Sequence, residues 1–223
     1  MYLMKLKLGI SFSSLGVIFS VHKTTAMRTF QTVLRCLAEA TKTWISTPSS
    51  YAISQTMPAC FKQHYPRCKY IIDCTEVRTE TPHGVDQQYS LFSTYKSSFT
   101  VKFLVAIIPN GTIAFVSKAY GGRNSDSFIT VDSGFVRLIE PGDIILSDKG
   151  FPGIRTSLEN KNAVLIMPPF SSRDRPFTEE EMNDTYNVAQ VRIHVERVIQ
   201  RIKLYNILTH RVPISLLPHI EEI

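Results

Sequence analysis

The chain has 223 residues, of which 43% are hydrophobic and 20% are charged. This balance is typical of a folded globular protein, and it excludes an intrinsically disordered chain and a protein embedded in a membrane. The length predicts one sizeable domain with an appendage rather than two equal domains. The formal net charge of +6 is compatible with a polyanionic partner such as nucleic acid, although a surplus of this size also serves solubility alone.

The N-terminal residues partly imitate a secretion signal. Lys5 and Lys7 precede an apolar stretch at 8–21, which is the order that a signal peptide requires. Serines interrupt the stretch and no clear small-residue cleavage site follows it, so we expect that it is not a signal. It is also shorter than the roughly 20 apolar residues of a membrane-spanning helix. The alternative, a secreted binding domain of ordinary α/β fold, requires that 8–21 be cleaved off.

Residues 1–45 are expected to be helical, with two apolar stripes separated by a break at 20–22. Two helices joined by a tight break are typical of a helix-turn-helix, whose second helix lies in the major groove of DNA. Lys23 and Arg28 would then reach DNA phosphates or base edges. A plain helical hairpin packed on the main domain fits the pattern equally well. The apolar positions are Leu15, Ile18 and Phe19 in the first stripe, and Met27, Phe30, Val33, Leu34 and Leu37 in the second.

Residues 46–68 contain three prolines and several serines and threonines, and this composition predicts a linker that carries one short helix. Cys60, His64 and Cys68 are evenly spaced, but a fourth ligand at the usual spacing of a zinc site is missing. We therefore interpret the cysteines as reduced, half-buried thiols of an intracellular protein.

Residues 69–223 alternate between strand-like and helix-like segments. The Pro-Asn-Gly sequence at 109–111 is a strong hairpin signal. Asn124 or Ser125 is placed to cap a helix that begins near Asp126. The expected strands are 69–77, 99–108, 112–118, 143–147 and 163–167, and the expected helices begin near 126 and span 153–160 and 188–205. A loop or an irregular hairpin is expected at 78–98, and a polar loop around Arg173.

The order of these segments predicts a mixed α/β sheet covered by helices. Five strands, of which the first three are antiparallel and the others parallel, form the ribonuclease H-like arrangement. In that arrangement the first strand is central and the fourth lies beside it. The chain is therefore expected to consist of a helix-turn-helix-like segment at 1–45, a linker at 46–68 and a ribonuclease H-like domain at 69–223.

Three acidic residues stand out by their positions. Asp73 lies inside an apolar strand, where an unpaired charge costs several kcal/mol unless a cation meets it. Asp148 closes the apolar run at 143–147, and the expected adjacency of the two strands brings it to Asp73. Glu196 lies in the last helix at the edge of the stripe that packs on the sheet. That buried stripe consists of Val191, Val195, Val198, Ile202 and Tyr205.

Each acid also has a plainer interpretation. Asp148 is a residue type that forms turns. Glu196 can form a surface pair with Arg192 one turn earlier, worth under about 0.5 kcal/mol. Asp126 at a helix start is stabilised by the helix dipole.

Taken together, the acids favour a metal site. Carboxylates about 4 Å apart repel by several kcal/mol at an effective dielectric near 20, and such a cluster is kept only for cations. Oxygen ligands without His or Cys favour Mg²⁺ or Mn²⁺ over zinc. Two such ions roughly 4 Å apart activate a water on one side of a phosphodiester and stabilise the leaving 3′ oxygen on the other.

At these residues the sequence resembles the DDE superfamily endonucleases of PIF/Harbinger-type transposases, and it is most similar to the branch found in THAP-domain-associated transposase-like proteins. The resemblance covers about 69–213, and its motifs are specific in order and spacing. A weaker similarity joins residues 8–30 to the helix-turn-helix that precedes the catalytic domain in this family. The matching segments are Ile71 to Glu76, Tyr95-Lys96, Thr100 to Leu104, Lys118 to Asp126, Pro141 to Asp143, Ser147 to Phe151 and Val191 to Val198.

The resemblance implies metal-dependent cleavage of double-stranded DNA at transposon ends, followed by strand transfer in which the freed 3′ hydroxyl attacks target DNA. It implies Asp73, Asp148 and Glu196 as the catalytic acids, and it adds Asp126 as a further ligand of the divalent metal, which replaces the helix-dipole interpretation of that residue. It also implies a nuclear protein that forms a homo-oligomer on DNA and has no membrane association. Some relatives need a separate DNA-binding partner protein.

Positive charges near these acids are expected to contact DNA. By charge and position, Lys96, Arg123, Lys149 and Arg192 are predicted to lie near the phosphate backbone. The THAP module and the final helix that are usual in the family are absent from the chain, as expected of a fragment or of a decayed or domesticated copy. A domesticated protein that binds DNA without cutting it is therefore the alternative function.

Overall fold

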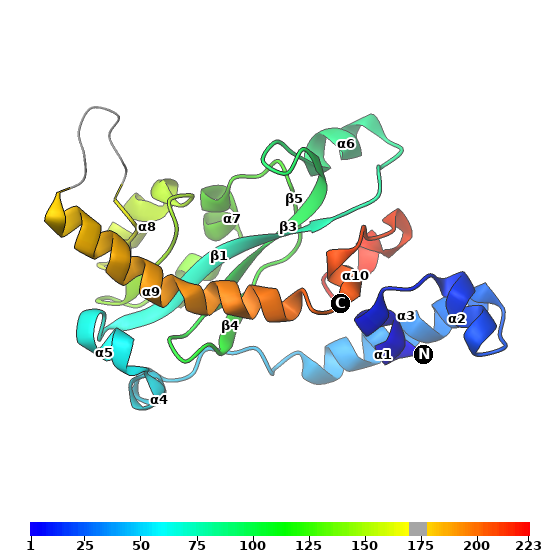
Figure 1. The fold of residues 1–223 in the computed structure, drawn as a ribbon, viewed down its shortest axis with the longest axis horizontal. Coiled ribbons are helices and arrows are strands. Elements are labelled where there is room, and N and C mark those ends of the chain that lie inside the picture. Colours follow the sequence, from blue (N-terminus) through cyan, green and yellow to red (C-terminus); the bar gives the residue numbers. More distant parts are fainter. Residues whose placement is uncertain (170–177) are drawn as a thin grey trace.

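The computed structural model describes residues 1–169 and 178–223, and a mixed sheet forms its centre (Figure 1). The central strand β1 pairs antiparallel with β3 and parallel with β6, while β4 lies on the other side of β3 and β7 on the other side of β6. This order confirms the predicted ribonuclease H-like sheet of five strands. Two-residue strands β2 and β5 also pair with β3. The strands are β1 (Cys68–Arg78), β2 (Phe92–Ser93), β3 (Ser98–Ile107), β4 (Ile113–Val116), β5 (Tyr120–Gly121), β6 (Ile144–Leu146) and β7 (Val164–Ile166).

The middle of the sheet is buried on both faces. Ile71, Ile72 and Leu104 are almost fully buried, as expected of β-branched and aliphatic residues in a strand that is covered by helices on both sides. The predicted hairpin joins β3 to β4, and Gly111 in its turn has a φ of 89°, a conformation that glycine adopts without strain.

Helices cover the sheet, with the long helix α9 running across it (Figure 1). Val191 and Val195 of α9 are buried in the core, and Ile129 of α7 is buried with them. Helices α7 and α8 confirm the expected helices in these regions, and the side chain of Ser125 caps α7 by accepting a hydrogen bond from the Phe128 N–H. The segments of this part are α6 (Val85–Leu91), α7 (Asp126–Asp132), η1 (Phe135–Leu138), η2 (Pro152–Ile154), α8 (Arg155–Glu159), α9 (Glu179–Ile202), α10 (Asn206–Thr209) and η3 (Ile214–His219).

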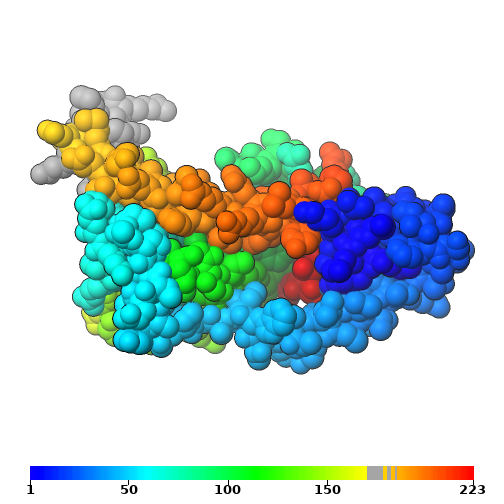
Figure 2. Space-filling view, turned by 60° about the horizontal axis from the view of Figure 1, so that its bottom comes forward, coloured from blue at the N-terminus to red at the C-terminus, as the bar shows by residue number. Residues whose placement is uncertain are grey.

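The N-terminal helices α1 (Tyr2–Leu8), α2 (Phe12–Ile18) and α3 (Lys23–Thr41) pack against the C-terminal segment at one end of the molecule (Figures 1 and 2). Phe30 and Leu34 of α3 share a second core with side chains of β1, β3 and the C-terminal segment. The expected helix, break and helix are confirmed. The stripe expected on the first helix is only partly buried, because Leu15 is covered while Ile18 and Phe19 are exposed.

Several boundaries differ from expectation. The polar region 78–98 contains helix α6, and the linker contains two short helices, α4 (Ser50–Thr56) and α5 (Ala59–His64). Helix α9 begins before residue 188 and ends at Ile202, so Tyr205 lies beyond it and is exposed rather than buried. The polar loop expected around Arg173 lies outside the described residues. Among the helices that are described, none has the length and hydropathy that a bilayer crossing requires.

Candidate active site

The pairing of β1 with β6 brings two of the predicted acids together. The two strands are parallel, and Ile71 pairs with Leu146. Asp73 follows Ile71 by two residues within β1, and Asp148 follows Leu146 by two residues, just beyond the end of β6. Because the strands are parallel and in this register, Asp148 comes close to Asp73, and its charge acts on the Asp73 carboxylate.

Asp73 is held in an environment that disfavours its charge. Burial and the neighbouring Asp148 raise the pKa of Asp73 to about 7, against the opposing influence of the Cys74 N–H and of Arg192. The Cys74 N–H donates a hydrogen bond of 2.8 Å to Oδ1 of Asp73. The positive charge around Asp73 is thus too small to offset its burial and the nearby Asp148. A bound cation would supply the missing positive charge.

Asp126 and Asp148 face the same small space, at Gly150. A Cβ atom on Gly150 would lie 2.9 Å from Oδ2 of Asp126 and 3.0 Å from Oδ1 of Asp148. Oδ1 of Asp148 accepts a hydrogen bond of 2.7 Å from the Gly150 N–H, so Asp148 also forms the turn that its sequence position suggested. Asp148 therefore forms a turn with Gly150 and at the same time lies near the carboxylate of Asp126.

Successive side chains of β1 point to opposite faces of the sheet, and this places Asp73 on one face and Asp126, which contacts Cys74, on the other. Thr75 and Val77 of β1 line a hollow together with Ile202 at the end of α9, so Asp73 shares the α9 face. Cys74 lies on the opposite face, where its thiol contacts Asp126 of α7 and where burial and then that carboxylate raise the thiol's pKa. Asp148, two residues beyond the end of β6, acts on Asp73 and also lies near Asp126 at Gly150.

Glu196 pairs with Arg192 rather than with the other acids. The Arg192 guanidinium donates a hydrogen bond of 3.3 Å to Oε1 of Glu196, whose side chain is 49% exposed. Arg192 also acts electrostatically on Asp73, so it lies on the side of α9 that faces the acids. The surface pair predicted as the plainer interpretation of Glu196 is therefore present.

The predicted acids have the chemistry that a divalent metal requires, and two of them, Asp126 and Asp148, lie close together at Gly150. The groups at Gly150 and beside Asp73 are hard oxygen donors, which suit Mg²⁺ or Mn²⁺. Glycine at position 150 allows the two carboxylates to approach the backbone closely, because a side chain there would press against both of them. In the described parts of the chain, no three His, Cys, Asp or Glu side chains gather closely enough to hold a metal ion. Glu196, the remaining predicted catalytic acid, pairs with Arg192 instead.

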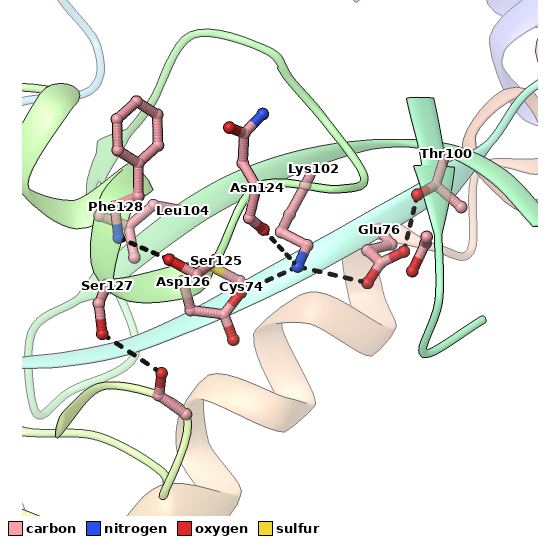
Figure 3. A network of polar contacts seen from close by, with 12 residues as sticks. Cys74, Glu76, Thr100, Lys102, Leu104, Asn124, Ser125, Asp126, Ser127 and Phe128 are labelled. Carbon is pink, nitrogen blue, oxygen red and sulfur yellow. Dashed lines mark hydrogen bonds and ion pairs between the residues drawn. The ribbon is translucent and has the colours of Figure 1, made fainter. Parts of the chain in front are cut away.

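A buried lysine beside these acids was not predicted as a site residue. Lys102 of β3 lies opposite Glu76 of β1, and its ammonium contacts Glu76, Asp126 and the carbonyl oxygen of Asn124 (Figure 3). A lysine within the apolar run 100–104 was the available signal, because lysines are rarely buried without a partner.

The positive residues predicted to bind DNA are all at least partly accessible. Lys23 and Arg28 are exposed on α3, and Lys149 is exposed directly after Asp148. The Lys96 ammonium lies 4.5 Å from the centre of the Tyr95 ring, and the Arg123 guanidinium lies 3.8 Å from that of Tyr89.

Lys203, which follows α9, adds a cation near the acids. Burial and then the nearby Lys96 lower the pKa of Lys203, while the charges of Asp73 and Glu76 oppose this effect. Lys96 and Lys203 therefore form a positive pair close to Asp73.

Two protein families match the chain. Residues 72–223 match the family described as DDE superfamily endonuclease, and residues 1–43 match the family described as helix-turn-helix of DDE superfamily endonuclease. The second match favours the helix-turn-helix over a plain helical hairpin for α2 and α3. No curated protein and no solved structure matches.

Proposed function

Because the chain belongs to the DDE superfamily endonuclease family over residues 72–223, we propose that it is a PIF/Harbinger-type transposase that cuts double-stranded DNA at transposon ends. The observation that carries this proposal is the parallel register of β1 and β6, which brings Asp148 close to Asp73. Strand transfer, in which the freed 3′ hydroxyl attacks a target phosphodiester, belongs to the same proposal.

In this proposal Asp73, Asp148 and Glu196 are the catalytic acids, and Asp126 joins them in holding Mg²⁺ or Mn²⁺. When bound, the metal supplies a nucleophilic water and stabilises the oxygen that leaves. Arg192 now pairs with Glu196 and faces Asp73. When DNA enters, Arg192 exchanges Glu196 for a phosphate and releases that carboxylate toward Asp73.

Two surfaces of the molecule bind DNA in this proposal. Lys23 and Arg28 are exposed on α3, the second helix of the helix-turn-helix, and they contact the transposon end in the major groove. Lys96, Arg123, Lys149 and Arg192 surround the acids and contact the phosphates near the cleaved bond. The protein acts in the nucleus as a homo-oligomer on DNA, with a separate DNA-binding partner protein where α3 alone does not select the end.

A cleavage assay tests the catalytic acids. Wild-type protein with Mn²⁺ should nick supercoiled plasmid, and Asp73→Asn or Asp148→Asn should remove the nicking while leaving DNA binding intact. Asp132→Asn is the matched control, because Asp132 is an exposed acid at the far end of α7 and pairs with Lys118. Nicking that survives in Asp73→Asn would show that another centre, or a contaminant, cuts the DNA.

One observation favours the alternative of a protein that binds DNA without cutting it. Glu196 is engaged by Arg192, and the described residues contain no ready group of three metal-binding side chains. In that case wild-type protein and Asp73→Asn are equally inert toward plasmid, while both bind DNA with the same affinity.

A further inference from the structure

Lys102 is buried at a point where three groups converge on its ammonium. Only 9% of the residue is exposed, and burying a lysine requires partners that replace water. Its Nζ atom lies 3.6 Å from Oε1 of Glu76 and 3.1 Å from Oδ1 of Asp126, and it donates a 3.1 Å hydrogen bond to the Asn124 carbonyl (Figure 3). The lysine is therefore fixed from both β1 and the segment that begins α7.

Glu76 anchors this lysine and is itself fully engaged. Its Oε2 atom accepts a 2.7 Å hydrogen bond from the Thr100 hydroxyl, while Oε1 faces Lys102. Both carboxylate oxygens of Glu76 are thus directed at β3, so Glu76 holds Lys102 in place from the side opposite Asp126.

The Asp126 carboxylate is contacted by the Cys74 thiol as well as by Lys102, and its two oxygens are in different situations. Oδ1 contacts Lys102 at 3.1 Å, whereas Oδ2 points to the space at Gly150 that Oδ1 of Asp148 also faces. A carboxylate with one oxygen tied to a rigid cation has little freedom to rotate. Its other oxygen is then held ready for a ligand, as with carboxylate ligands of metals, which are oriented by hydrogen bonds from their surroundings.

We propose that Lys102 is a positioning residue, whose ammonium, anchored by Glu76, orients Asp126 so that Oδ2 faces Asp148 and is presented to a divalent cation. This inference rests on the proposed function, and it assigns a role to a residue that touches neither DNA nor metal. The positive charge of Lys102 near Asp126 also repels a metal cation. The net effect of Lys102 on metal affinity is therefore the gain from orienting Asp126 minus the loss from this repulsion. Rigid orientation dominates, because the cation needs both carboxylates in one geometry.

The test is calorimetric titration of the full chain with Mn²⁺ in the absence of DNA. Lys102→Met alone would leave Glu76 buried without a cation, so the informative variant is Lys102→Met combined with Glu76→Gln. The reference is Glu76→Gln alone, which retains the contact between Lys102 and Asp126. Loss of an orienting contact around a metal ligand weakens binding by about 10- to 100-fold, and we expect this loss in the double variant but not in the reference.

Two further variants separate orientation from general stability. Lys102→Arg keeps a cation that reaches Asp126, and it should restore most of the affinity. Lys69→Met removes the matched lysine at the other end of β1, which also contacts two acids, and it should destabilise the fold without changing Mn²⁺ affinity. In cleavage assays, the double variant should need more Mn²⁺ for half-maximal rate while approaching the reference rate at saturating Mn²⁺.

Each outcome decides between the proposals. Equal Mn²⁺ affinity in the double variant and in Glu76→Gln overturns the role of Lys102 while leaving the metal site in place. Wild-type protein that takes up no Mn²⁺ overturns the metal dependence in the proposed function, and the role of Lys102 with it. An affinity loss of the same size in Lys69→Met shows that instability, rather than orientation, governs binding.

Discussion

Two buried lysines in the same sheet show how similar ion clusters serve different purposes. Lys69 of β1 contacts Glu140 at 2.7 Å and Asp143 at 3.0 Å, and Lys102 of β3 contacts Glu76 and Asp126. Each ammonium meets two carboxylates, so the two clusters have the same formal charge. Their surroundings differ, because Asp73 and Asp148 add further negative charge beside Asp126 only.

The two clusters also differ in the further contacts that their acids make. Oδ2 of Asp143 contacts Lys69 and also accepts a hydrogen bond from the Glu140 N–H, so the two acids of this cluster are linked to each other as well as to the lysine. Asp126 keeps Oδ2 directed at the space beside Gly150. We therefore interpret the Lys69 cluster as structural, whereas Asp126 of the Lys102 cluster has an oxygen beside a second carboxylate, an arrangement that can receive a cation.

The largest expected effect is on the pH dependence of stability. Asp73 has an ordinary pKa of 3.8 and a pKa of about 7 in the folded protein. The folded protein therefore binds this proton more tightly than the unfolded chain does. The resulting contribution to the free energy of unfolding is complete below about pH 4 and is lost as the pH rises through about 7. We expect metal-free protein to lose up to about 4 kcal/mol of unfolding free energy from this group between pH 4 and pH 8. Urea denaturation in EDTA measures the loss.

Asp73→Asn is the control, because it removes the titrating group. The Lys69 cluster responds with the opposite sign: hydrogen bonding to Lys69 lowers the pKa of Glu140, so its contribution is lost as the pH falls. Saturating Mg²⁺ at pH 8 should return much of the lost stability to wild-type protein and little to Asp73→Asn. Identical pH profiles for the two proteins would show that Asp73 ionises normally.

The second largest expected effect tests the structural role of Lys69. Lys69→Met leaves Asp143 almost buried without its cation, and breaking a buried pair in this way is strongly destabilising. We expect a loss of about 3 kcal/mol in the free energy of unfolding, moderated because Glu140 is largely exposed. Adding Asp143→Asn should recover part of that loss. Urea denaturation at neutral pH checks both values, and a double variant no more stable than Lys69→Met would contradict the pairing.

Much of the fold could be predicted from the sequence, because apolar runs and turn residues carry local information. Asp73 and Asp148 were recognisable as acids that end up adjacent, since strand order in a ribonuclease H-like sheet makes β1 and β6 neighbours. Helix α6 was missed because it has only seven residues, its apolar residues are interrupted by polar ones, and none of them is buried.

The arrangement of side chains around the acids could not be predicted. Which face of β1 receives α7 depends on packing between distant segments, so the contact between Lys102 and Asp126 leaves no local pattern. The same holds for Glu196, whose pairing with Arg192 follows from helical spacing, while its distance from Asp73 depends on how α9 crosses the sheet. The metal-binding and DNA-binding roles of all these residues stay predictions.

A smaller effect tests the space between the carboxylates. Gly150 has an ordinary backbone conformation, so Gly150→Ala is tolerated by the chain, but its methyl group would push against Oδ2 of Asp126 and Oδ1 of Asp148. The carboxylates move aside more easily than the backbone, so Mn²⁺ affinity should fall by roughly 10-fold, or about 1.4 kcal/mol, with little change in melting temperature. Gly84→Ala is the matched control, because nothing lies closer than 3.8 Å to its added methyl. Equal Mn²⁺ affinities for the two alanine variants would place the cation elsewhere.

The smallest effect concerns the end of the molecule that lies away from both lysines. Lys23 and Arg28 are exposed on α3, whose Phe30 and Leu34 pack against the C-terminal segment, so truncating the two cations leaves the packing face of α3 intact. Each removed phosphate contact should lower the slope of log affinity against log salt by about 0.9. Fluorescence anisotropy on a DNA duplex at several salt concentrations measures this slope.

Thr41→Ala is the control on the same helix, because its hydroxyl bonds to the Leu37 carbonyl within α3. A slope that stays constant in Lys23→Ala and Arg28→Ala would place the DNA contacts of this family member entirely around the acids, where Lys96 and Lys203 gather beside Asp73.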